Sequence, residues 1–146
     1  MSVVAFKEGI LAADTCAYGG RGQASPGQKA KIHRLEDGTR VGIVSAVLGE
    51  PERFLAWMKD GEDRTKWTGD KPDLRALIIR PSGEVFLADD SIWFSGPIEC
   101  ATYGIGSGGD YAQGAMAMGA SAKQAVYVAC DLDPYCGAPV QTLERD

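Results

Sequence analysis

Short apolar runs recur along the first 90 residues of the chain, with lengths typical of β-strands. These runs come in pairs, and a short polar segment containing glycine separates the members of each pair, which predicts β-hairpins. The Gly/Ser/Pro-rich segment 18–28 separates the first two hairpins and is expected to be a loop. The paired runs are residues 3–6 with 10–13, 30–35 with 40–47, and 74–79 with 85–88.

The first helical pattern follows the second hairpin, at residues 50–59. A helix here places Phe54, Leu55 and Met58 on one face, and Pro51 falls in the first turn, where its missing N–H would have no helical partner. A polar connection then leads to the third hairpin. The sequence therefore predicts one short helix against the sheet formed by the second and third hairpins.

The last third of the chain predicts a strand, two helices and a final strand. A short strand at 101–103 leads into a glycine-rich turn, and Gly119 suits the end of the helix that this turn opens. A capping box of serine and glutamine opens a second helix at 121–131, and residues 138–143 form the final strand. The order of elements predicts an α+β fold, with sheets packed under helices, in a single domain covering 1–146.

The glycine-rich turn supports two hypotheses. Gly104, Gly106 and Gly109 have the spacing of a dinucleotide-binding turn, in which Asp131 would have to hold the ribose. That function needs a second parallel strand where the capping box predicts a helix, so the nucleotide hypothesis is the weaker one. The same turn also presents Ser107 between a strand and a helix.

Composition excludes several classes of function. The net charge is -5, from 15 basic and 20 acidic residues, which argues against a nucleic-acid or anionic-membrane surface. The apolar runs are too short to span a bilayer and no secretory signal is evident, so a cytoplasmic protein is expected. Four cysteines without CxxC spacing and a single histidine predict reduced thiols and no metal site.

Five segments together resemble proteasome β-subunits and the bacterial HslV protease. They are residues 1–7, 10–14, Lys31, 106–112 and 133–137, in the order that those proteins show. The resemblance spans almost the whole chain. It implies the N-terminal nucleophile hydrolase fold, a four-layer αββα sandwich, here with a reduced helical layer because the chain offers one helix where the family usually has two.

The resemblance also implies supporting roles for Asp14, Lys31, Ser107 and Asp133 around an N-terminal nucleophile. Cys136 stands where the family usually has serine. The family's oxyanion-hole glycine falls near residues 45–46, where the backbone N–H of Ala46 can still donate.

The chemistry of such a set is coherent. A hydroxyl needs an adjacent base, and a free α-amine on the same residue, with a reference pKa of about 8, can serve. A lysine cation nearby lowers the pKa of that amine by like-charge repulsion, and an aspartate holds the lysine. Each of these residues also has a purely structural interpretation, such as an ion pair, a helix cap or a turn.

Ser2 is the predicted nucleophile, after removal of Met1. Successive side chains of a strand alternate faces, so an even separation from Asp14 preserves the family's geometry. Ser2 lies twelve positions before Asp14, and Met1 lies thirteen. Methionine before serine is generally removable by aminopeptidase, which would expose the required free amine.

The resemblance further implies a ring or double ring of identical subunits, unfolded polypeptide or peptide substrates, and an ATP-dependent unfoldase as partner, with no cofactor. The alternative from another class is a catalytically inactive structural or assembly subunit that keeps the fold and retains Met1.

Overall fold

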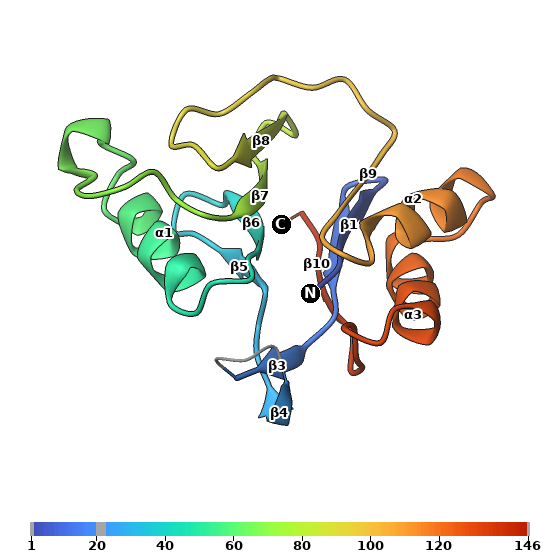
Figure 1. Ribbon diagram of the computed structural model, residues 1–146. Helices are drawn as coiled ribbons and strands as arrows, with labels where there is room; N and C mark the ends of the chain where they lie inside the picture. Colours follow the sequence, from blue (N-terminus) through green and yellow to red (C-terminus); the bar gives the residue numbers. More distant parts are fainter. Residues whose placement is uncertain (1, 20–22, 146) are drawn as a thin grey trace.

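The computed structural model describes residues 2–19 and 23–145, and it contains two four-stranded sheets (Figure 1). Met1 lies outside the described residues. The first sheet has the order β10-β2-β1-β9 and the second has the order β5-β6-β7-β8. Every strand pairing within them is antiparallel. In chain order the strands of the two sheets are β1 (Val4–Lys7), β2 (Ile10–Ala13), β5 (Ile32–Arg34), β6 (Arg40–Val44), β7 (Arg75–Ile79), β8 (Val85–Asp89), β9 (Thr102–Ile105) and β10 (Gln141–Leu143).

The described residues form three α-helices, which cover the outer faces of the sheets (Figure 1). The helix α1 (Glu50–Lys59) lies against the second sheet, whereas α2 (Gly109–Ala117) and α3 (Ala122–Leu132) lie against the first. The predicted capping box is present, because the Ser121 and Gln124 side chains each bond to the other residue's backbone N–H. The predicted α+β class is confirmed. No helix within the described residues is long and apolar enough to cross a membrane.

The two-residue period of β1 separates two apolar clusters. Val4 and Phe6 pack between the two sheets, while Val3 and Ala5 pack under α2 and α3. Small residues dominate the second cluster, which lets the helices approach the sheet closely. By the same alternation, Ser2 faces the second sheet.

Aromatic side chains from loops complete the outer face of the second sheet, which α1 alone does not fill. Trp67 follows a short 3₁₀ helix (Arg64–Lys66), and Phe94 belongs to the long connection after β8. Both rings contact Phe54 and Trp57 of α1, with ring centroids between 5.6 and 6.4 Å apart. The predicted shortage of one helix is therefore offset by loop aromatics.

The prediction of a loop at 18–28 was wrong. Two antiparallel strands, β3 (Cys16–Tyr18) and β4 (Ala24–Gln28), form a separate two-stranded ribbon. Every residue of β4 is exposed, so backbone pairing rather than a buried face defines the strand. Alternation of apolar and polar residues cannot reveal a strand with no buried face.

The predicted edges of several strands also differ from the structure. Residues 45–47 form a turn after β6 instead of extending it, because the Ser45 hydroxyl bonds the Asp73 carbonyl and the Val47 N–H. The strand β9 continues to Ile105, and β10 begins only at Gln141.

The nucleotide hypothesis is not supported by this topology. The segment after the glycine turn forms α2 and α3, and Asp131 is exposed near the end of α3 rather than at the end of a parallel strand. The antiparallel sheets contain no βαβ unit among the described residues.

Gly42 allows the two sheets to approach each other closely, because it has no side chain where Val4 packs. A Cβ at this position would lie 2.5 Å from Cγ1 of Val4, a stiff side chain in a packed core. Gly42→Ala should lower the free energy of unfolding by about 1–3 kcal/mol, measured by urea denaturation. Gly114→Ala in α2 is the control, because a Cβ there meets nothing within 4 Å and should leave stability unchanged or raise it. Equal stability of the two variants would contradict the prediction.

Candidate functional site

The carboxylate of Asp14 occupies the centre of the candidate site, directly after β2. It is completely buried, and both of its oxygens lie 2.9 Å from Nζ of Lys31. The Oδ1 atom accepts a hydrogen bond from the Val3 N–H at 3.0 Å, and Oδ2 accepts from the N–H groups of Cys16 and Gly137 at 3.2 and 3.1 Å. All of these partners donate, so an ionised carboxylate suits the position.

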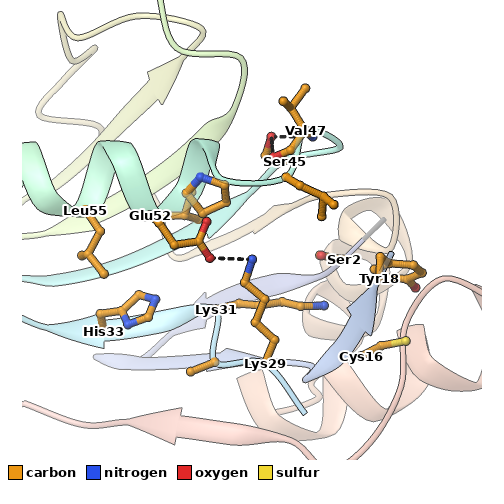
Figure 2. A pocket seen from close by; sticks show the side chains of 14 residues that line it. Ser2, Cys16, Tyr18, Lys29, Lys31, His33, Ser45, Val47, Glu52 and Leu55 are labelled. Carbon is orange, nitrogen blue, oxygen red and sulfur yellow. Dashed lines mark hydrogen bonds and ion pairs between the residues drawn. The ribbon is translucent and has the colours of Figure 1, made fainter. Parts of the chain in front are cut away.

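Lys31 is nearly as buried as its partner, with 6 % of its side chain exposed. It lies just before β5, and its Nζ is 5.7 Å from the centre of the Tyr18 ring. Lys31 also lines the pocket that Ser2 lines, so the second sheet carries this cation to the N-terminal segment of the first (Figure 2). The buried cation is held in place by the ion pair with Asp14.

Ser2 is buried where the glycine turn meets the start of the chain. Its N–H donates to Oγ of Ser107 at 3.1 Å, and its carbonyl accepts from the Gly108 N–H at 3.0 Å. Gly106 has a φ of 94°, and a Cβ there would overlap the Ser2 carbonyl. Gly106, one of the three glycines that suggested a nucleotide site, therefore allows this turn to lie against the backbone of Ser2.

Asp133 lies directly after α3 and bonds the residues that follow it. Its carboxylate accepts from the Tyr135 N–H at 2.9 Å and from the Cys136 thiol at 3.4 Å. Burial acts to raise the pKa of Asp133, but hydrogen bonding from Ser107, Tyr135 and Cys136 outweighs it and holds the pKa below its usual value. Burial, with the charges of Asp14 and Asp133, raises the pKa of Cys136, so its thiol stays protonated and donates. The Cys136 thiol thus donates a hydrogen bond to Asp133.

Ala46 does not line the pocket beside Ser2. It is exposed in the turn after β6 and lines a second hollow with Gly106, whereas its neighbours Ser45 and Val47 line the pocket beside Ser2. Its proposed role as an oxyanion donor stays a prediction.

A second set of pocket residues was not predicted from the sequence. Lys29 forms a 2.7 Å ion pair with Glu52 of α1, and His33 lies beside them (Figure 2). The signal was present, because Lys29, Lys31 and His33 are spaced two apart and so share one face of an extended segment. Their partner on α1 is remote in sequence, so the pattern alone did not identify it.

No metal centre is formed within the described part of the chain, since no three His, Cys, Asp or Glu side chains come together in a way that could hold an ion. The site is instead a pocket with a buried serine, a buried lysine-aspartate pair and a carboxylate near the serine's backbone. This set contains a hydroxyl, a cation and hydrogen-bonding groups that can orient an amine, which are components of nucleophilic catalysis.

Comparison with known proteins identifies the fold. No protein-family model and no curated protein sequence matches the chain. Among similar solved structures, HslV from Trypanosoma brucei has 17 % identity and a TM-score of 0.66, with 98 % of each chain covered. BPH of Thiobacillus denitrificans has 20 % identity and a TM-score of 0.63, covering 99 % of this chain and 98 % of that one. A complex of BPH with epoxomicin gives 22 % identity, the same coverage and a TM-score of 0.63.

The chain therefore has an HslV/proteasome-like fold, and the resemblance drawn from its sequence is confirmed at that level.

Asp14→Asn should be strongly destabilising. The amide has one acceptor oxygen where the carboxylate has two, and the substitution leaves the Lys31 charge buried without its counter-ion. We expect a loss of about 3 kcal/mol or more in urea denaturation. Asp89→Asn is the matched control, because it breaks a 3.0 Å ion pair with Arg75 whose side chains are about half exposed, and should cost less than about 1 kcal/mol. A loss no larger than the control's would show that the buried pair does not stabilise the fold.

Proposed function

We propose that this chain is an N-terminal nucleophile peptidase that hydrolyses peptide bonds through Ser2 once Met1 has been removed. The observation that carries the proposal is that Ser2 and the buried, Asp14-paired Lys31 line one pocket. The HslV/proteasome-like fold supports it independently. In this proposal the elements form the family's four-layer αββα sandwich, with α1 and loop aromatics as one helical layer.

The chemistry follows from the groups present. As Oγ of Ser2 attacks the peptide carbonyl carbon, its proton passes to the free α-amine of the same residue. The C–N bond then breaks, the departing amine takes that proton, and the acyl group remains as an ester on Oγ. A water molecule then attacks the ester carbonyl, and its proton passes to the α-amine and from there to Oγ of Ser2. This step releases the carboxylic acid and regenerates Ser2.

The other residues have supporting roles in this proposal. The Lys31 cation favours the neutral form of the α-amine and so keeps it able to accept a proton. Ser107 already accepts from the nitrogen of Ser2, and the charged Asp133 beside it orients the same nitrogen. The Ala46 N–H, in the turn that borders the pocket, stabilises the oxyanion.

Self-association into a ring is part of the proposal, because a single domain would leave the site open to folded proteins. Apolar side chains on the outer helices support it: Tyr111, Met118, Tyr127 and Leu132 are all exposed on or beside α2 and α3. Unfolded polypeptide or peptides are the substrates, delivered by an ATP-dependent unfoldase. The four cysteines are all free, which fits a cytoplasmic location.

The nucleophile is tested by removing Met1. Protein trimmed to Ser2 should hydrolyse fluorogenic peptides and be labelled covalently by epoxomicin, the compound present in one of the similar structures. Protein that retains Met1 should do neither, because its Ser2 nitrogen is an amide and cannot accept the proton. Ser2→Ala should abolish both signals, and Ser2→Thr, which keeps the hydroxyl, should preserve them. Intact mass spectrometry reports the N-terminus and the label together.

A lack of hydrolysis and labelling in trimmed, assembled protein, with several peptide classes, would overturn the peptidase proposal. The inactive structural subunit would then be the better account of the fold.

Assembly makes a separate prediction. Light scattering at micromolar concentration should give a mass several times the 15.5 kDa of one chain. Tyr127→Glu should reduce that mass, because it places a charge on the proposed interface of α3. Trp93→Glu is the control, because this exposed residue lies in the connection after β8. A strict monomer would contradict the ring.

A further inference from the structure

The pocket beside Ser2 is small and mostly apolar. Its volume is about 80 Å³, roughly half of the 150 Å³ cavity that accommodates benzene. An aliphatic side chain therefore suits it better than an aromatic ring. Its apolar walls come from the end of β6, the following turn and one face of α1: Ile43, Val47, Leu48, Pro51 and Leu55.

One ion pair spans this pocket, from the segment between β4 and β5 to α1. Nζ of Lys29 lies 2.7 Å from Oε1 of Glu52, and the two side chains are 39 % and 57 % exposed (Figure 2). Hydrogen bonding to Lys29 lowers the pKa of Glu52, so its carboxylate stays charged. An ion pair this exposed adds little to stability, so its main effect is on the charge that a ligand meets in the pocket.

The charges that line the pocket balance within the described part of the chain. Lys31 is paired with Asp14, and Lys29 is paired with Glu52. Burial, followed by the charge of Lys59, lowers the pKa of His33, so its ring is neutral at pH 7. A charged side chain entering the pocket would lose water without gaining an unpaired opposite charge.

We infer that the Lys29–Glu52 ion pair determines substrate selectivity: with the pair intact, the pocket takes a small, uncharged aliphatic side chain from the residue that supplies the cleaved carbonyl. This residue is assigned because its Cα is bonded directly to the attacked carbon, which makes its side chain the nearest to Ser2. The inference rests on the proposed peptidase function for its catalytic consequence, while the binding preference itself does not require turnover.

Breaking the pair from either side should give opposite preferences. Glu52→Gln leaves the Lys29 cation unpaired, so the pocket should bind acidic side chains relatively more tightly than it does in the wild type. Lys29→Gln leaves the Glu52 carboxylate unpaired, so the pocket should bind basic side chains relatively more tightly than it does in the wild type. Because the site is partly solvated, we expect a shift of about tenfold in each relative preference at low salt, smaller at high salt.

Binding is measured first, on protein that retains Met1 and so does not turn over. The chain has a single histidine, so the ring resonances of His33 in NMR report directly on the pocket. The probes are N-acetylated Ala-Ala-Leu, Ala-Ala-Glu and Ala-Ala-Lys amides. The wild type should bind the leucine peptide most tightly. The Glu52→Gln variant should have a higher relative affinity for the glutamate peptide, and the Lys29→Gln variant a higher relative affinity for the lysine peptide.

Two controls isolate the effect of the pair. The charge-reversed double variant, Lys29→Glu with Glu52→Lys, restores neutrality and should restore the leucine preference. Asp60→Asn removes one partner of the exposed 3.5 Å pair with Lys66, away from the pocket, and should leave every preference unchanged. The same series is then measured with fluorogenic versions of the peptides on trimmed protein.

The outcomes separate the two proposals. The predicted binding preferences without hydrolysis in trimmed protein would sustain this inference and overturn the peptidase function. Hydrolysis with preferences that neither single substitution changes would sustain the function and overturn the inference. A wild type that binds the charged peptides as tightly as the leucine peptide would also overturn it.

Discussion

The buried carboxylate of Asp14 is the constraint on which the rest of the site depends. It accepts hydrogen bonds from the backbone N–H next to Ser2, from the first backbone N–H of β3 and from a backbone N–H in the segment before β10. It also accepts hydrogen bonds from the side chain of Lys31, which precedes β5. One anion thus joins parts of the chain that are remote in sequence, including both sheets. Since every partner is a donor and the site is completely buried, a neutral or apolar side chain could not hold the same arrangement.

Close approach of backbones is the second requirement. Gly106 lets the turn before α2 lie against Ser2, and Gly108 lets the same turn lie against Val3 and Cys136. Gly42 lets the second sheet pack against Val4. These contacts leave room for a buried serine at the edge of the cluster between the sheets. The outer face of the second sheet is covered less regularly than that of the first. Beside α1, Trp67 and Phe94 fill the surface that a second helix would otherwise cover.

The proposed function depends on how charges are distributed between two ion pairs. The Lys31–Asp14 pair is buried and fixes the position of a cation beside Ser2, whereas the Lys29–Glu52 pair is partly solvated and faces the cavity. Burial makes the first pair a structural requirement, and exposure leaves the second free to change without loss of the fold. The proposed division is that the first serves the chemistry and the second serves selectivity.

The sequence by itself determined the elements whose causes are local. Hairpins at β1–β2, β5–β6 and β7–β8 followed from paired apolar runs around short turns, and α3 followed from its capping box. The order of short motifs indicated the fold and predicted that Asp14 and Lys31 belong to the site. Tertiary structure alone decided the β3–β4 ribbon, the pairing of Lys29 with Glu52 and the packing of the glycine turn on Ser2. Those features arise from contacts between remote segments or from exposed backbone pairing, and neither leaves a period in the local pattern of apolar residues.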